Sequence, residues 1–302
     1  MSRKNNLKQT EKSSDRRRKY IYKQLKECQV GDQCNFYAVV LDATFPHKSV
    51  KSDRYLCTVK VADLSQRFNN QGIVDFVSVV FFANKFDELP VCQQVGDIIR
   101  VHRATAGQFK DRKQMTANVC FNSSWALFPS QFSDQSTKKH LIDEFCPSSF
   151  FGKSCQVERE EHKLLRNLRR WVKENFATKQ VLSTEYIVPL DKAAEYGAPK
   201  EEEGNKFHDF DLQGKIIQLF KTDIHQSEMR LIDQSGEIWH SSTFNNKYVN
   251  LREGNFVRIR LANLSNHYRG YTNTFGMRSY SNIMTLPYPC KLAEDMLFDE
   301  VA

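Results

Sequence analysis

One stretch of this sequence occurs twice, and it constrains the fold more than any other feature. Residues 95–128 begin with a Gly-Asp turn, continue as β-branched residues interleaved with His and Arg, break at residues 107–111, and resume as an apolar run that ends in aromatics. This pattern predicts a β-hairpin. Residues 254–262 match residues 96–104 in the glycine, the first arginine, the alanine and the apolar alternation. The repeat therefore indicates that one β-rich fold occurs twice.

The segments around each copy predict a small barrel. Residues 35–45, 55–63 and 75–83 have the composition of strands, residues 84–90 that of a short helix or turn, and the hairpin supplies strands four and five. Five strands with a short element after the third describe an oligonucleotide-binding (OB) barrel, whereas a lipocalin would need eight strands. The second copy predicts strands at residues 207–220, 228–233, 237–243, 254–263 and 275–286. The predicted fold class is all-β, with two tandem five-stranded OB-fold barrels and a few connecting helices.

The remaining segments predict a basic arm, a linker and one long helix. Residues 1–19 hold eight Lys or Arg and two Asp or Glu, so they carry +6 of the chain's net charge of +8. We expect a disordered arm there, with a nucleic-acid contact or nuclear localisation patch at residues 16–19. We expect the first barrel at residues 20–130, a linker at 131–157 and the second barrel at 158–302. Residues 158–176 have apolar side chains at helical spacing and predict an amphipathic helix that covers the second barrel.

Composition and motifs favour a binding protein over an enzyme. A sequence pI near 9.0 favours a polyanionic partner. The eight cysteines contain no CxxC pair and several lie in apolar runs, so we expect reduced core thiols and no zinc site. No apolar run approaches the length of a transmembrane helix. The sequence shows no GxxxxGK loop and no clustered carboxylates with metal spacing, so we expect no catalytic residues, no metal and no cofactor.

Several motifs resemble the telomere end-binding protein alpha subunit of ciliates, within the wider protection-of-telomeres family. They are FYAVVLDATFPHK (36–48), FANKFDELP (82–90), GDIIRVHRAT (96–105), FNSSWALF (121–128), LRNLRRWV (165–172) and SYSNI (279–283). The resemblance spans nearly everything from residue 19 to residue 286 and is looser in the second half. It implies two tandem OB barrels that hold the single-stranded G-rich 3′ overhang in a groove across both. It also implies a nuclear protein of chromosome ends, which acts in capping or in telomere replication.

The resemblance also carries over a set of residues near the DNA, which are Lys48, Lys60, Phe82, Phe109, Phe121, His240 and Tyr280. To these the residue patterns add the basic, aromatic and polar candidates Lys51, Arg103, Trp239, Asp42, Gln114 and Asp223. The last three are expected to read the edges of guanine bases. Phenylalanines stand where the family has tyrosines at positions 109 and 121, which keeps the stacking face and removes a hydroxyl. Trp239 and His240 are neighbours on a strand and point to opposite faces, so we expect only one of them to meet DNA.

Two other functions share parts of this pattern. A general single-stranded DNA-binding protein of the replication type has the same fold, and it would lose little affinity when the DNA sequence is scrambled. A nuclease could use the barrels to deliver its substrate. The ciliate alpha chain continues into a third barrel that binds a beta partner, and this sequence ends soon after the second. We therefore expect a short form without that partner, or a DNA-binding segment.

Overall fold

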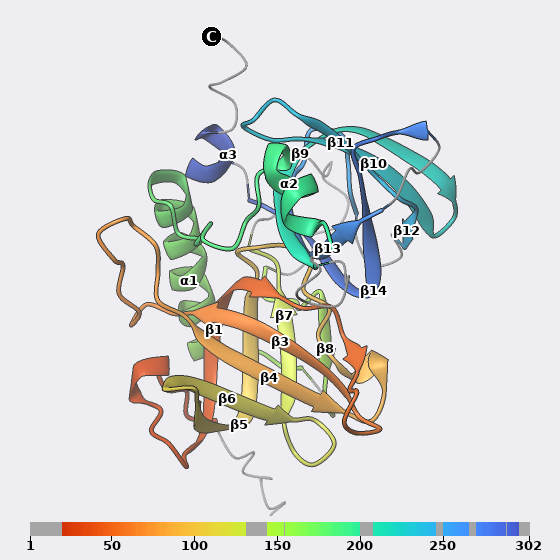
Figure 1. Ribbon diagram of the computed structural model, residues 1–302. Helices are drawn as coiled ribbons and strands as arrows, with labels where there is room; N and C mark the ends of the chain where they lie inside the picture. The colour runs from red at the N-terminus through yellow and green to blue at the C-terminus, as the bar shows by residue number, and fades with distance from the viewer. Residues whose placement is uncertain are drawn as a thin grey trace, which may run out of the picture.

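The structure is a computed structural model that describes residues 20–130, 144–153, 155–199, 208–245, 250–265, 270–287 and 289–295. The basic arm at residues 1–19 and residues 131–143 and 154 of the expected linker lie outside these described residues. Two barrels lie one above the other in Figure 1, the first in warm colours and the second in green to blue.

The first barrel closes from five strands. They are β1 (Gln33–Ala43), β3 (Tyr55–Ala62), β4 (Val77–Ala83), β5 (Ile98–Phe109) and β6 (Arg112–Asn118). Their order is β1-β3-β4-β6-β5, and β5 pairs again with β1. The β4–β6 pair is parallel and the other four pairs are antiparallel. Three short strands extend this sheet, β2 (His47–Lys48), β7 (Ser124–Phe128) and β8 (Ser149–Phe151).

The second barrel repeats this topology. Its strands are β9 (Phe210–Asp223), β10 (Gln226–Ile232), β11 (Ile238–Ser241), β13 (Phe256–Leu264) and β14 (Thr274–Thr285), and the two-residue strand β12 (Phe244–Asn245) pairs with β10. The order β9-β10-β11-β14-β13 closes through β9, and β11–β14 is again the parallel pair. The predicted fold class, two five-stranded barrels, is confirmed.

The repeat extends to the backbone. Arg103 in β5 and Leu261 in β13 have φ angles of 57° and 58°, which are uncommon for residues other than glycine. Each lies in a β-bulge, where the backbone N–H of the extra residue does not pair with the neighbouring strand. Asn35 Oδ1 accepts the Arg103 amide at 3.0 Å, and Asp211 Oδ1 accepts the Leu261 amide at 3.0 Å. The two barrels are therefore equivalent residue by residue at this point.

The hairpin prediction holds for the first part of residues 95–128 and is wrong for the rest. Lys110 and Asp111 form the turn between β5 and β6 with φ angles of 46° and 61°, as a two-residue type I′ turn requires. The returning arm, however, is two strands. The first half of β5 pairs with β7 and the second half with β6, because the bulge at Arg103 bends β5 between them. Phe121 consequently lies in the connection between β6 and β7, outside both strands.

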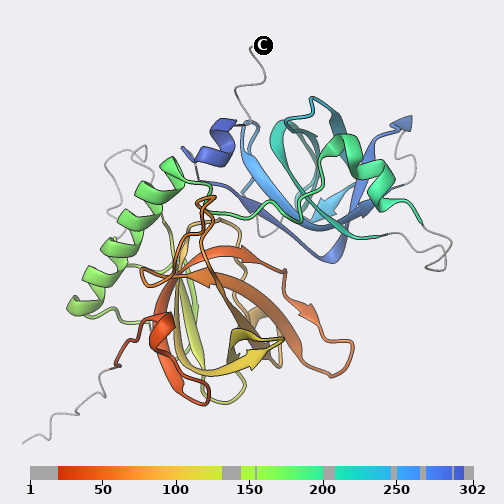
Figure 2. The ribbon, with the colours of Figure 1, turned by 60° about the vertical axis from the view of Figure 1, so that its left-hand side comes forward.

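The helix predicted at residues 158–176 exists as α1 (Arg159–Thr178), but it does not cover the second barrel. Its buried residues Leu165, Leu168 and Val172 belong to the core of the first barrel. Figure 2 shows α1 running along the outside of that barrel. The expected placement is wrong because a buried polar network at the helix start, described below, fixes α1 to β1 and β5.

Two further α-helices complete the described chain. α2 (Leu190–Gly197) packs on β9 and β13 of the second barrel. α3 (Lys291–Asp295) lies beside α1, and its Ala293 is buried in the core of the first barrel. Single 3₁₀ turns occur at Leu25–Glu27 and Phe86–Glu88. Within the described residues, no helix combines the length and the apolar character needed to cross a membrane.

Candidate nucleic-acid interface

Strand alternation builds an outward face on the first barrel. Lys60 in β3 lies opposite Ser78 in β4, which lies opposite Gln114 in β6, so the three form one row. Two further rows are Thr58, Val80 and Thr116, and Leu56, Phe82 and Asn118. We call these nine residues the groove face. In OB barrels the second and third strands, with the adjoining loops, form the surface that binds oligonucleotides, and β3 and β4 are those strands here.

Phe82 is on this face and not in the core. It is partly exposed, whereas its neighbour Phe81 is fully buried in the barrel. Gln114 is also partly exposed. The structure therefore brings three sequence-predicted residues, Lys60, Phe82 and Gln114, onto one surface.

The Phe76 ring lies between two basic side chains, Lys60 and Arg112, at the end of the Lys60 row. Lys60 Nζ is 5.1 Å from the centroid of Phe76, and Arg112 Cζ is 5.9 Å from it. Such distances suit a cation–π contact. Neither Phe76 nor Arg112 was among the residues predicted from the sequence. Phe76 begins an apolar run and looked like a core residue, and a single charge such as Arg112 after a turn carries no signal by itself. The hairpin register, which pairs Arg112 with Phe109, could have indicated it.

Two rings at the adjoining connections are open to solvent. Phe109 ends β5 with 58% of its surface exposed, and Phe121 is 74% exposed. Each has a cation nearby, since Lys110 Nζ lies 5.7 Å from the Phe109 ring and Arg54 Cζ lies 5.8 Å from the Phe121 ring. An exposed ring beside a positive charge can stack on a base while the cation meets a phosphate.

The predicted lysines of the β1–β3 connection are at the surface. Lys48 Nζ forms an exposed ion pair with Asp53 Oδ1 at 3.1 Å, and Lys51 is exposed. An exposed pair of this kind contributes little to stability, so a phosphate can displace it at low cost.

Asp42 lies at the contact between the barrels. Its side chain is 7% exposed, and its Oδ2 is 2.7 Å from Arg260 Nη1 of the second barrel and 3.3 Å from Lys60 Nζ. Arg260 Nε is also 3.3 Å from Asp211 Oδ2. The sequence predicted Asp42 as a reader of base edges, whereas in this structure its carboxylate joins the Lys60 row to the second barrel.

Further contacts hold the barrels together near the end of β1. The buried Asn282 side-chain amide donates to the carbonyls of Ala43 and Cys92 at 2.9 and 3.1 Å. The rings of His47 and Tyr280 lie 5.9 Å apart, and the Tyr280 hydroxyl donates to Asp209 at 3.2 Å. Tyr280 is therefore at the junction, beside the loop that carries Lys48 and Lys51.

On the second barrel the adjacent aromatics point to opposite faces. Trp239 is 3% exposed and packs in the barrel core, so the structure removes it from the candidate surface. His240 faces outward and stacks on Tyr271, with centroids 3.5 Å apart and an interplanar angle of 13°. Burial, and then the nearby Arg230 charge, lower the pKa of His240. Asp223 is exposed at the end of β9, where its carboxylate accepts the amide of Ile224 at 2.7 Å.

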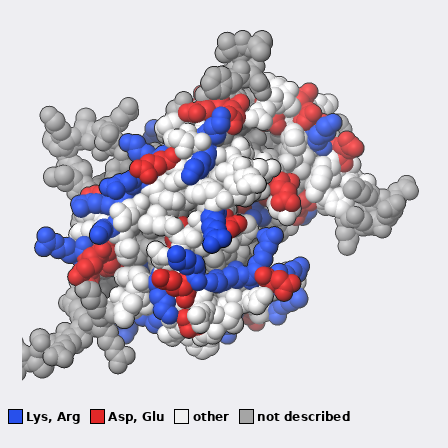
Figure 3. Space-filling view, turned by 90° about the vertical axis from the view of Figure 1, so that its left-hand side faces the viewer, with Lys and Arg blue, Asp and Glu red and all other residues white. Residues whose placement is uncertain are grey.

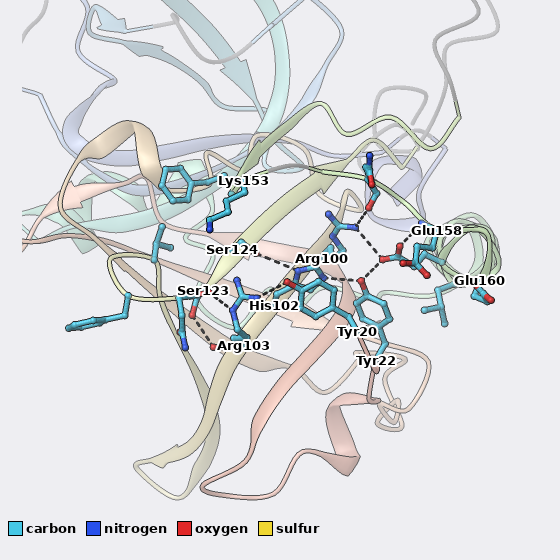
Figure 4. A pocket seen from close by; sticks show the side chains of 18 residues that line it. Tyr20, Tyr22, Arg100, His102, Arg103, Ser123, Ser124, Lys153, Glu158 and Glu160 are labelled. Carbon is cyan, nitrogen blue, oxygen red and sulfur yellow. Dashed lines mark hydrogen bonds and ion pairs between the residues drawn. The ribbon is translucent and has the colours of Figure 1, made fainter. Parts of the chain in front are cut away.

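Arg103 faces a second concavity, which Phe121 also lines. A cavity of about 840 Å³ lies between β5, the connection after β6 and the start of α1. Figure 4 shows Arg103 there beside Ser123 and Tyr20. Its guanidinium donates to the Tyr20 hydroxyl at 2.6 Å and to the carbonyl of Asn122. The Tyr20 ring stacks on His102 with centroids 3.8 Å apart.

A buried polar network forms the floor of this cavity and fixes α1. Glu161 Oε1 accepts bonds from Tyr22, from Tyr37 at 2.8 Å and from Arg100 at 3.2 Å. The Arg100 charge and the hydrogen bonds hold the pKa of Glu161 below its usual value, although burial is the largest influence and opposes them. Burial first, and then the charges of Arg100 and Arg103, lower the pKa of His102 to about 3.

Charges of both signs occupy the side of the molecule that carries α1. Figure 3 shows groups of basic side chains there with acidic ones between them. Among the described residues, no group of three or more His, Cys, Asp or Glu side chains is placed to hold a metal ion. All eight cysteines are free, and five of them are buried.

Two models of known protein families match this chain. The model described as "Telomeric single stranded DNA binding POT1/CDC13" matches residues 16–182, more than half of the chain. The chain belongs to this family. The model "Telomere end-binding protein alpha subunit OB2 domain" matches residues 198–297. The resemblance drawn from the sequence motifs is thus confirmed.

Relatives in ciliates are similar along nearly the whole chain. The telomere-binding protein subunit alpha of Stylonychia mytilus is 34% identical over 300 residues, and that of Sterkiella nova is 33% identical over 294. Each match covers 94% of this chain and 57% of the relative, so the chain spans little more than half the length of these relatives. A crystal structure of fission yeast Pot1 with single-stranded DNA is 16% identical, covers 92% of both chains and has a TM-score of 0.40, too low to add to the assignment.

Proposed function

We propose that this chain binds the single-stranded G-rich 3′ overhang of telomeres in a groove that crosses both barrels. The observation that carries the proposal is the groove face, where Lys60, Phe82 and Gln114 share one surface flanked by the exposed rings of Phe109 and Phe121. Basic groups can accompany the phosphates while rings stack on successive bases. The relatives are named as telomere-binding proteins, which supports telomeric DNA as the ligand.

The strand passes from the first barrel to the second at the junction of His47 and Tyr280. These rings belong to different barrels and lie 5.9 Å apart, so one stretch of DNA can touch both. His240 and Tyr271 supply a further stacked pair on the second barrel. We place the protein in the nucleus at chromosome ends, where this binding serves capping or telomere replication.

We infer that the two units divide at residues 183–187. Buried residues through Leu182 pack into the first core, and most buried residues from Val188 onward form the second. The exceptions, which pack on the first core, are Phe256, Met284, Leu286, Cys290 and Ala293. This division assigns α1 to the first DNA-binding unit and leaves α2 with the second. Limited proteolysis tests it, because the first stable fragment should retain α1.

Competition binding tests the proposed function. A labelled G-rich single strand is displaced by unlabelled G-rich, scrambled and duplex DNA of equal length. We expect the scrambled strand to compete at least tenfold less well, about 1.4 kcal/mol. Equal competition by the scrambled strand would instead identify a general single-stranded DNA-binding protein.

The proposal is one of binding without a chemical step. The labelled strand is incubated with magnesium and an excess of the protein. Its length on a denaturing gel should remain unchanged. Shortening of the strand that increases with protein concentration would contradict it and favour the nuclease alternative.

A further inference from the structure

The repeated backbone gives a residue-level correspondence between the two faces. Asn35 and Asp211 hold the equivalent bulges, and seven residues further along their strands (35 to 42 and 211 to 218) stand Asp42 and Gln218. The pairing register slips immediately before each of these, in β1 against β3 and in β9 against β10. Two bulges at the same spacing in both barrels make Asp42 and Gln218 counterparts.

The strand pairings then extend this correspondence across each face. In the first barrel the row is Asp42, Lys60, Ser78 and Gln114. In the second barrel it is Gln218, Arg230, His240 and Thr274. Arg230 is therefore the counterpart of Lys60. This correspondence is not visible in the sequence, because residues 55–63 and 228–233 are too dissimilar.

The side chain that Arg230 meets on β9 is neutral, and the carboxylate of Glu228, two residues earlier on β10, also acts on the neighbouring His240. Arg230 Nη1 donates to the neutral amide oxygen of Gln218 on β9 at 3.1 Å. Its counterpart Lys60, in contrast, pairs with the negatively charged carboxylate of Asp42. Next to Arg230 on β11 is His240, whose ring is stacked on Tyr271. A guanidinium beside a stacked pair of rings repeats the combination of Lys60 and Phe76 on the first barrel.

We propose that Arg230 holds a backbone phosphate of the single strand on the second barrel, beside a base that stacks on the His240–Tyr271 pair. The proposal rests on the proposed function and names the residue through which the second barrel takes part. The planar guanidinium presents paired donors that match two phosphate oxygens, which makes it suited to this contact. In single strands, each neutralised phosphate changes the slope of log affinity against log salt by about 0.7.

The test is a salt titration of binding to a G-rich single strand long enough for both barrels. Arg230→Gln should weaken binding roughly tenfold, about 1.4 kcal/mol, and lower the salt slope by about 0.7. Arg230→Lys keeps the charge and should keep most of the slope. Lys192→Gln makes the same charge change at an exposed position of α2 that is not part of the row, and should leave affinity and slope near those of the wild type.

Each outcome separates this inference from the proposed function. If Arg230→Gln, folded by circular dichroism, keeps the wild-type slope while the wild type still prefers the G-rich strand, the inference is wrong and the function stands. A loss of G-rich preference at an unchanged slope would show base reading and also overturn the phosphate contact. If the wild type shows no G-rich preference, the proposed function itself fails.

Discussion

At the scale of single residues, the direction of a side chain decides whether it can serve the groove. Phe81 and Phe82 are neighbours in β4, yet one fills the barrel and the other lies on the groove face. Trp239 and His240 divide in the same way on β11. Successive side chains of a strand point to opposite faces, so one member of each pair faces the barrel interior. That member is buried and cannot contact DNA.

Phe109→Ala should weaken binding of the G-rich strand about tenfold or more, because a stacked base contributes roughly 1 to 3 kcal/mol. The ring is 58% exposed, so its loss should leave the thermal midpoint of unfolding nearly unchanged. Phe150→Ala is the matched control, since Phe150 is 49% exposed on β8 and outside the groove face. Fluorescence anisotropy measures both variants, and equal affinity in the two would remove Phe109 from the interface.

His102 should make the protein less stable in mild acid. Its pKa is lowered from 6.5 to about 3, so between these values the unfolded chain binds a proton that the folded chain does not. The free energy of unfolding should therefore fall as the pH falls through this window, by up to about 1.4 kcal/mol per pH unit from this group. His102→Gln should flatten that dependence in urea unfolding between about pH 7 and pH 5. Parallel curves for the variant and the wild type would contradict the assignment.

At the scale of elements, α1 shows how a helix can be predicted correctly and placed incorrectly. The spacing of Leu165, Leu168 and Val172 fixes an apolar stripe, but any apolar surface could cover it. The placement is decided at the helix start, where Glu161 meets Arg100 at 3.2 Å and Tyr37 at 2.8 Å. A buried carboxylate needs such partners, and β1 and β5 of the first barrel supply them.

Leu165→Ala should destabilise the first barrel by about 2 to 5 kcal/mol, because it removes a fully buried side chain and leaves a cavity. Hydrogen exchange followed by mass spectrometry locates the effect. Faster exchange should appear in β1 and β5, while β9 and β13 keep their protection. The exposed Lys163 on the same helix gives the control, Lys163→Ala, which should change neither region. Faster exchange confined to β9 and β13 would overturn the placement of α1.

At the scale of the whole molecule, the barrels are joined at the edge of the groove face. Asp42 links Lys60 of the groove face with Arg260 of the second barrel, at 3.3 and 2.7 Å. Asn282 holds the end of β1 from the other side. The loop with Lys48 and Lys51 starts directly after these contacts, so the second barrel helps to position it.

A double-mutant cycle between Asp42→Asn and Arg260→Gln should give a coupling energy of about 0.5 to 3 kcal/mol in the unfolding of the chain, because the two side chains are in contact and mostly buried. The single variants should also lose affinity for strands that span both barrels more than for strands that fit one. Lys23 and Asp32 form a control pair at 2.9 Å, since both are more than a third exposed and should couple weakly. Strictly additive effects of Asp42→Asn and Arg260→Gln would show that the contact does not join the barrels energetically.

Most of the strands, a break in residues 107–111, the repeat and the motifs of the family could be predicted from the sequence, because alternation, turn chemistry and local spacing depend on neighbouring residues. The partner of each element, in contrast, depends on the three-dimensional arrangement of the chain. Asp42 meets Arg260 across 218 positions of the chain, α1 turns back to the first barrel, and the counterpart of Lys60 is Arg230. These contacts depend on barrel closure and on how two barrels dock, which bring together residues that no local pattern connects.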